Sequence, residues 1–358
     1  MRIFQNRKKK QPNEAPIPAL TYAERKVFEI PQSGGRQPYS VYDQMEQDSM
    51  IQTVLNTKKL AVLAAPYRLE TSETEDGLRR REFIEKVFEE MEGSPKTILM
   101  QAMDAFAKGW SVQELVFEPR GEGVILKAVR PKNPARFGLE LDEYGVPSQL
   151  HLHLPGEPVQ ELDRSRFVVY RHRHQYARSK GTSDLDSVVP HWRAKQSLLA
   201  AWKIHLERYA SPTVLGRYAR GLPREEQESI ASVLSQLSQK TSIVFPSELE
   251  VSLLGGDRGA STGFQEAIDY HNREIARAIL GNTLTVDEGR RIGSMTLGRV
   301  HLQVMMMQMD VLREDLAREV MTEQVIRPLI EMNFGGGEVP RFMFSRSKLS
   351  LFGEEVDG

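Results

Sequence analysis

Apolar residues recur with helical spacing in three successive segments of the chain, 42–65, 78–92 and 95–108. Residues three, four and seven positions apart share one helix face, so each segment is predicted to bury an apolar stripe. Ser94, directly before a proline, is typical of a helix start, because the serine hydroxyl caps a free amide. Gly109 is expected to end the last of these helices.

After Gly109 the pattern changes to short runs in which apolar and polar residues often alternate. Alternation with a period of two is typical of strands, and the Gly and Pro residues between the runs favour hairpin turns. Five strands are expected, over 110–117, 124–129, 137–141, 148–154 and 166–172. Residues 41–182 are therefore predicted to form one α+β domain, with helices first and an antiparallel meander after them.

Two more helices are predicted over 187–210 and 262–280. The residues between them mix short strand and helix patterns, so 211–261 is expected to form a small αβ unit. Along both helices apolar side chains recur at spacings that suit packing against another helix. The residues expected to make this contact are Trp192, Leu199, Trp202, Leu206, Phe264, Ile268, Ile275 and Ile279.

Residues 281–294 show no periodicity and contain several glycines, so they are predicted to form a loop. A long helix is predicted over 295–334, and Pro328 is expected to kink it near its end. Its buried face is expected at Leu297, Val300, Val304, Met307 and Val311. Two helices that bracket a small unit, followed by a loop and a long helix, indicate an elongated subunit rather than a globular enzyme.

Composition narrows the function classes. The 358 residues carry a net charge of −1, which argues against a protein that grips nucleic acid tightly. Near-neutral charge remains compatible with a protein through which DNA slides, because each strong contact to phosphate would slow the movement. The chain has no cysteine, so disulfides, thiolate catalysis and thiolate metal sites are excluded. No apolar run approaches the roughly 20 residues of a membrane-spanning helix, and no membrane association is expected.

The sequence carries no convincing catalytic signature. The phosphate-loop, dinucleotide-binding, zinc-protease and serine-hydrolase motifs are all absent. His151 and His153, like His172 and His174, share a face of a predicted strand, so a metal-dependent enzyme built on these four imidazoles is one alternative. No carboxylate is spaced to complete such a site, and exposed strand histidines are the favoured interpretation. No catalytic residue, metal ligand or cofactor is therefore predicted.

Three stretches resemble the portal proteins of bacteriophages, especially the branch found in Mu-like phages. They are AFAKGWSVQELVF at 105–117, the segment 183–218, and the helix–loop–helix from Phe264 to Met332. The first resembles the helix-to-strand step of the family, and the second resembles its long helix with a proline-containing entry to the small domain. The resemblance covers roughly residues 41–334 and rests on the order of these stretches.

The resemblance implies an α+β, elongated portal-type subunit with an α+β wing, a two-helix stem, a small αβ clip and a long kinked helix. Each segment then has an expected part: an N-terminal irregular arm over 1–40, the wing over 41–182, the first stem helix over 183–210, the clip over 211–261, the second stem helix over 262–280, the tunnel loop over 281–294, the long kinked helix over 295–334 and a short C-terminal segment over 335–358.

The resemblance also implies partners. Such proteins form a homo-oligomeric ring, typically of twelve subunits, at one vertex of the capsid of the virion, after assembly in the host cytoplasm. Double-stranded DNA passes through the channel, and the ring contacts the capsid protein, docks the large terminase and later docks a head–tail adaptor. The candidate DNA-proximal residues of the tunnel loop are Asp287, Glu288, Arg290 and Arg291. Another oligomeric connector or tail component of a phage is the second alternative.

Overall fold

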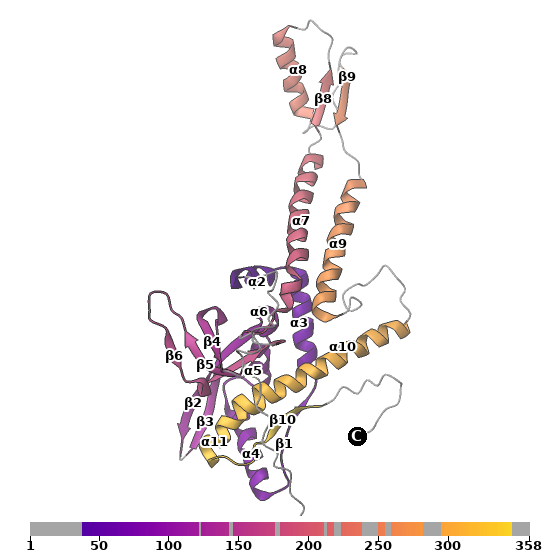
Figure 1. Ribbon diagram of the computed structural model, residues 1–358. Coiled ribbons are helices and arrows are strands. Elements are labelled where there is room, and N and C mark those ends of the chain that lie inside the picture. Colours follow the sequence, from indigo (N-terminus) through magenta and orange to yellow (C-terminus); the bar gives the residue numbers. More distant parts are fainter. Residues whose placement is uncertain are drawn as a thin grey trace, which may run out of the picture.

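The computed structural model describes residues 38–121, 123–142, 146–175, 180–210, 213–217, 223–237, 250–254, 259–281 and 295–345. An α+β body carries an arm of two long helices, and a small αβ unit sits at the far end of the arm (Figure 1). The elongated, mixed helix and sheet architecture expected from the sequence is confirmed. The expected N-terminal arm over 1–40 lies almost wholly outside the described residues.

The N-terminal part of the body is helical. The helices are α2 (Tyr39–Met45), α3 (Ser49–Leu63), α4 (Glu75–Glu90), α5 (Pro95–Ala102) and α6 (Ala105–Lys108). The single helix predicted over 42–65 is wrong, because Asp48 starts a new helix by accepting hydrogen bonds from the amides of Met50 and Ile51. Ser94 caps α5 as predicted, and Gly109 ends α6 in the left-handed conformation.

Two three-stranded sheets follow, where the sequence predicted one meander. The first has the order β3 (Gly123–Lys132), β2 (Trp110–Arg120), β7 (Phe167–Arg171), and the second is β4 (Phe137–Leu141), β5 (Pro147–Leu152), β6 (Gln160–Leu162). The meander is wrong because β7 returns to pair with β2. Strand β7 is apolar on both faces: Val168 and Tyr170 enter the main core, while Phe167 and Val169 enter a second core between the sheets.

The C-terminal helical segments cross the body. They are α10 (Met295–Asp315), a π-helical segment (Leu316–Ile326) and α11 (Arg327–Phe334), and β10 (Arg341–Phe344) then pairs antiparallel with β1 (Tyr67–Glu70). The helix therefore changes its hydrogen-bonding register at Leu316, twelve residues before Pro328. Strand β1 was not among the strands predicted from the sequence.

The buried face predicted for the long helix is wrong. Met305, Met309 and Leu316 are buried against the body, whereas the predicted residues Val300, Val304, Met307 and Val311 are between 44% and 60% exposed; the side chain of Leu297 lies outside the described part. The orientation is fixed by Arg313, whose guanidinium donates to the carbonyls of Ala61 and Val62 at the end of α3. Those carbonyls have no partner within their own helix, so the arginine acts as its cap.

Two amide side chains join this helical path to the first sheet. Gln324 accepts a hydrogen bond from Val169 N at 2.8 Å and donates to Val169 O at 3.1 Å on the outer edge of β7. Asn333 makes the same pair of bonds, both 2.8 Å long, with Val124 on the outer edge of β3. Helix and sheet are therefore connected at both edges of the sheet.

Replacing Gln324 with methionine should lower the free energy of unfolding by about 1–3 kcal/mol, because the backbone N–H and C=O of the buried residue Val169 lose a partner while the side-chain volume is kept. The measurement is chemical denaturation, with faster hydrogen exchange expected at the Val169 amide. Glu323→Gln, which changes an exposed helical pair with Arg327, is the control and should cost at most about 0.5 kcal/mol. Equal losses in the two variants would contradict the bridging role.

The arm consists of α7 (Val189–Ala210) and α9 (Gly259–Leu280), and its distal unit contains β8 (Thr213–Arg217), α8 (Arg224–Leu237) and β9 (Glu250–Leu254). Strands β8 and β9 pair antiparallel, with Thr213 opposite Leu254. These elements agree with the predicted helices and αβ unit, and the remaining residues of 211–261 lie outside the described part of the chain. Gly281 ends α9 with a φ of +75°, as expected for a helix stop.

Candidate functional site

The two arm helices lie side by side, and the predicted contact residues divide between their interior and their surface (Figure 1). On α9, Ile268, Ile275 and Ile279 are buried and Phe264 is half-buried. On α7, Trp192 packs on the body core and Trp202 is half-buried, but Leu199 and Leu206 are exposed in the single chain. The α9 residues thus face the subunit interior, and part of the α7 set faces outward.

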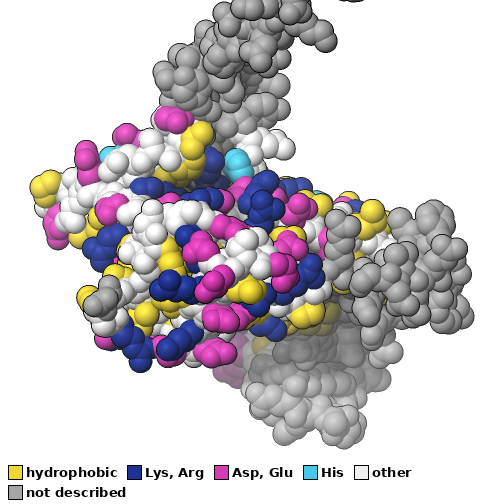
Figure 2. All heavy atoms as spheres, turned by 90° about the horizontal axis from the view of Figure 1, so that it is seen from below, with side chains coloured by type: hydrophobic (Ala, Val, Ile, Leu, Met, Phe, Trp, Pro, Cys, Tyr) yellow, Lys and Arg dark blue, Asp and Glu magenta, His cyan; other side chains and the backbone are white. Residues whose placement is uncertain are grey.

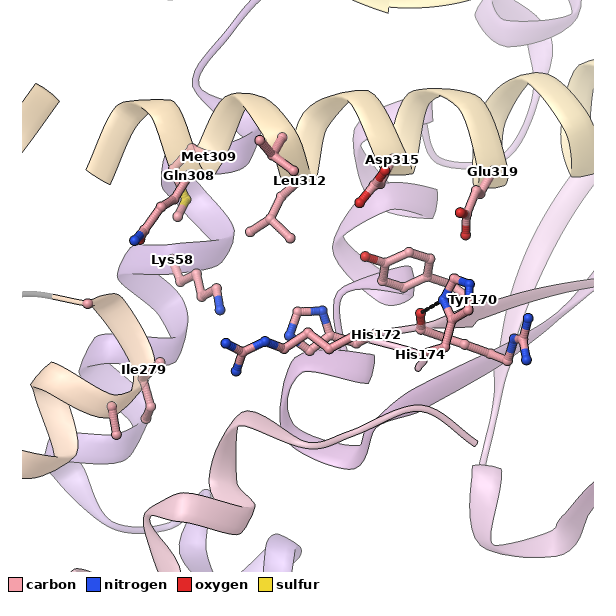
Figure 3. A pocket seen from close by; sticks show the side chains of 15 residues that line it. Lys58, Tyr170, His172, His174, Ile279, Gln308, Met309, Leu312, Asp315 and Glu319 are labelled. Carbon is pink, nitrogen blue, oxygen red and sulfur yellow. Dashed lines mark hydrogen bonds between the residues drawn. The ribbon is translucent and has the colours of Figure 1, made fainter. Parts of the chain in front are cut away.

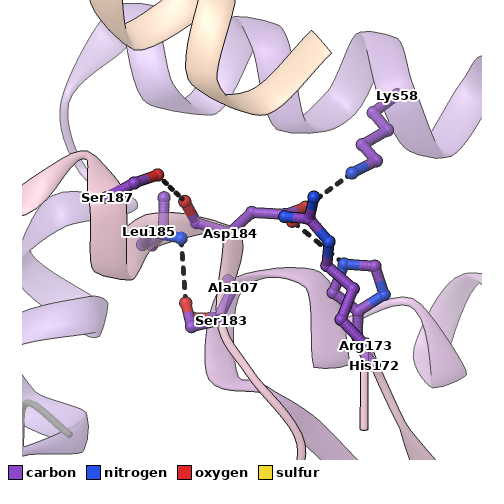
Figure 4. Close-up of polar contacts among 8 residues, drawn as sticks. All are labelled: Lys58, Ala107, His172, Arg173, Ser183, Asp184, Leu185 and Ser187. Atoms are coloured by element: carbon purple, nitrogen blue, oxygen red, sulfur yellow. Dashed lines mark hydrogen bonds and ion pairs between the residues drawn. The ribbon is translucent and has the colours of Figure 1, made fainter. Parts of the chain in front are cut away.

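The base of the arm is joined to the body by a polar group that we call the junction cluster: the buried residues Lys58, His172 and Asp184, and the exposed Arg173 (Figure 4). Asp184 lies in the 3-10 turn that precedes α7, and its carboxylate is 2.6 Å from Lys58 Nζ, 3.0 Å from His172 Nε2 and 3.2 Å from Arg173. Lys58 comes from α3, and the other two follow β7. One carboxylate therefore ties three separate chain segments together.

A second ion pair supports the same joint. Lys195 on α7 lies 2.8 Å from Asp48, the residue that caps α3, and both side chains are almost fully buried. The orientation of the arm relative to the body is thus held by two buried carboxylate pairs.

Burial and the neighbouring charges set the protonation states of Asp184 and His172 in the junction cluster. Burial alone would raise the pKa of Asp184, but its hydrogen bond to His172 and the nearby Lys58 ammonium outweigh burial and lower the pKa to about 2. Burial, followed by the repulsion of Lys58 and Arg173, lowers the pKa of His172 despite the carboxylate beside it. At neutral pH the cluster therefore holds an ionised carboxylate, a charged lysine and a neutral imidazole.

A cavity of about 460 Å³ adjoins the junction cluster, between the end of β7, the end of α9 and α10 (Figure 3). Lys58 and Arg173 stand on one side, and Asp315 at the end of α10 and Glu319 in the π-helical segment stand on the other. Burial raises the pKa of Glu319, and the neighbouring Asp315 adds to the shift. The described lining contains no serine, threonine or cysteine, and the His172 imidazole is engaged by Asp184, so a Ser–His or Cys–His pair is not among these residues.

The four strand histidines do not converge. His151 lies on β5 of the second sheet and contacts Glu140, while His172 follows β7 of the first sheet and belongs to the junction cluster. Within the described part of the chain, no group of three or more histidine and carboxylate side chains could hold a metal ion. Among the described residues, the strand histidines therefore do not form the shared site considered from the sequence.

Positive and negative side chains are interspersed on the underside of the body (Figure 2). Cross-strand and loop pairs such as Lys132 with Glu114 and Arg130 with Glu92 account for part of this mixture. Among the described helices, none combines the length and apolar character needed to span a membrane.

The candidate DNA-proximal residues Asp287, Glu288, Arg290 and Arg291 lie outside the described residues. The described chain on either side ends at Gly281, which borders the cavity, and resumes at Met295.

Comparisons with known proteins agree with this architecture. Residues 39–351 match the model of the family described as portal protein of Mu bacteriophage. The chain is 25% identical over 305 residues to the portal protein of Escherichia phage Mu, covering 82% of this chain and 56% of that protein. It is 22% identical over 326 residues to the Mu-like prophage FluMu protein gp29 of Haemophilus influenzae, covering 88% and 61%. The chain thus spans less than two thirds of the length of either relative.

Solved structures share the fold. A chain from the neck of a native gene transfer agent particle, determined with C12 symmetry, matches with a TM-score of 0.61 at 12% identity over 87% of this chain and 84% of its own length. A chain from the neck of the empty particle, determined with C6 symmetry, has a TM-score of 0.61 at 11% identity over 83% and 81%. With a family match that extends over nearly all of the described residues, the chain belongs to the family of Mu bacteriophage portal proteins.

Proposed function

We propose that the chain is the structural, non-enzymatic subunit of a portal ring that conducts double-stranded DNA into and out of a phage capsid. The observation that carries the proposal is the family match over residues 39–351. The elongated shape supports it, since a body, a helical arm and a distal unit suit a subunit that extends along a channel (Figure 1). The neck chains of similar fold come from assemblies with cyclic symmetry, which supports a ring of identical copies.

In this ring the described parts take the roles that the family resemblance implies. The body over 41–182 is the wing, α7 and α9 are the stem, and the distal unit within 211–261 is the clip. The clip docks the large terminase during packaging and then the head–tail adaptor, and the ring contacts the capsid protein at one vertex of the virion, after assembly in the host cytoplasm. Hydrolysis of nucleotide is left to the motor, in agreement with the absence of a phosphate-loop motif.

The experiment that tests this function is electron microscopy of the purified chain with mass measurement. The expected result is a closed ring with a central channel wide enough for duplex DNA, with twelve subunits. A filament, a hexamer or a stable monomer at high concentration would overturn the proposal and favour another connector or tail component.

The channel loop over 281–294 provides a second test. Arg290 and Arg291 are proposed to contact DNA, with Asp287 and Glu288 limiting the attraction, so that the grip stays weak and reversible. Replacing both arginines with alanine is expected to reduce DNA packaging or retention of packaged DNA, while ring assembly is unchanged. Packaging and retention equal to those of the unmodified chain would remove this role.

A further inference from the structure

We propose that the outward face of α10 is a docking surface for the next copy of the chain in the ring; the inference rests on the ring function proposed above. The surface, which we call the outer stripe, consists of Val300, Val304, Met307 and Val311. These residues follow one another at intervals of four, three and four, so they form one continuous line along the helix.

The outer stripe is unpartnered in the single chain. Its four side chains are 44%, 45%, 55% and 60% exposed in sequence order. The opposite side of α10 is also apolar, but there Met305 and Met309 are buried against the body. A helix that is apolar on two opposite faces is expected to bury both against protein, and the body buries only one of them.

The surroundings of the outer stripe offer no charged side chain that would hold DNA tightly. From Val300 to Met309 the helix has no Asp, Glu, Lys or Arg. A polyanion requires lysine and arginine side chains to replace its counterions, and this run has none. Depletion of charge with enrichment of methionine is instead typical of the core of a protein–protein interface.

A recess lies at one end of the outer stripe. Val311 lines the cavity beside the junction cluster, together with Met309 and Leu312 of the same helix (Figure 3). A line of apolar side chains that runs into a recess lets a neighbour insert an anchoring side chain, which is the usual source of affinity in an interface. The cavity beside the junction cluster and the outer stripe thus form one continuous surface.

A second copy fits this surface better than any other partner. In a ring every subunit contacts its neighbours through two different faces, so a face on α10 has a different receiving surface on the next copy. The neck chain that shares the fold over 87% of this chain stands in a particle neck determined with C12 symmetry. Leu199 and Leu206 on α7 add further exposed apolar surface, so the contact between copies is expected to extend to the arm.

The absence of native cysteine makes a direct test possible. Val304→Cys introduces a single thiol in the middle of the outer stripe, and valine to cysteine is a small change at an exposed site. In one sample the thiol is labelled with a benzophenone maleimide before assembly, the ring is irradiated, and the crosslinked peptides are mapped by mass spectrometry. In a second sample the thiol is left free, and its reactivity towards a bulky maleimide is compared before and after assembly. Lys86→Cys, at an exposed position of α4 on the body, is the matched control.

The expected result is a ring in which Val304→Cys gives covalent dimers between neighbouring copies and loses reactivity towards a bulky maleimide on assembly, whereas Lys86→Cys stays reactive. A ring in which the unlabelled thiol of Val304→Cys remains reactive, or in which the benzophenone at this position captures only residues of its own chain, would overturn the docking surface and leave the portal function standing. If the unmodified chain forms no ring at all, the portal function fails and the docking surface fails with it.

Discussion

Replacing Asp184 with asparagine is expected to lower the free energy of unfolding by about 3–5 kcal/mol, because the Lys58 ammonium then stays buried without a counter-charge. The Asp184 side chain is 1% exposed and Lys58 lies 2.6 Å from it, so water cannot replace the lost carboxylate. Thermal or chemical denaturation measures the loss. Glu85→Gln, which alters an exposed helical pair with Arg81, is the control and should cost at most about 0.5 kcal/mol.

The same variant has a pH signature. Since the pKa of Asp184 is lowered to about 2 in the folded chain, its carboxylate contributes stability above the unfolded pKa of about 4 and loses it as the pH falls towards the folded value. The lowered pKa of His172 acts in the same direction, since protonation is easier in the unfolded chain. The stability difference between the unmodified chain and Asp184→Asn should therefore shrink below about pH 4. A difference that stays constant down to pH 2 would refute the ionic account.

Gly181→Ala is the second variant with a large expected effect. Gly181 has a φ of +63°, and a Cβ placed on it would lie 2.4 Å from the carbonyl oxygen of Gly109 and 2.5 Å from that of His172. These two segments are already hydrogen-bonded, His172 N to Gly109 O at 2.9 Å, so the backbone has no room to move apart. The loss should reach about 3 kcal/mol or more, from left-handed strain plus overpacking.

Gly121 gives an unusually close control for this prediction. It has the same φ of +63°, and nothing lies within 4 Å of a Cβ placed there. Gly121→Ala should therefore show the conformational strain alone, about 1–2 kcal/mol. If the two alanine variants lose the same stability in denaturation experiments, the crossing of the three backbone segments does not constrain the fold.

The helices were largely predictable from sequence because their signals are local. Ser94 and Gly109 mark ends that depend on a few neighbouring atoms, and the apolar side of α9 follows from its spacing alone. The sheet arrangement was not predictable in this way. Strand β7 pairs with β2 across some fifty residues of intervening chain. Which strand lies in the centre of the sheet depends on how side chains divide between the two cores, and local alternation of apolar and polar residues does not show to which core a side chain belongs.

The junction cluster illustrates the same limit for the site. His172 drew attention as one member of a histidine pair, but Lys58 and Asp184 look like ordinary solvated charges in the sequence. Lys58 and Asp184 are separated by 126 positions in the sequence, and a contact between residues so far apart leaves no periodic signal. For α10 the sequence pattern was read correctly as apolar and assigned to the wrong side, since a helix with two apolar faces gives no indication of which one its own subunit covers.

The amide pairs of Gln324 and Asn333 have a consequence for the free subunit in the cell. A protein made in many copies before it assembles is exposed to pairing between the outer strands of different molecules, the first step of fibrous aggregation. At Val169 and Val124 the groups that would accept a foreign strand are already engaged by side chains of the same chain. At these two positions, contacts between copies are thereby left to side chains, which select a partner by shape, whereas an uncovered strand edge would accept almost any sequence.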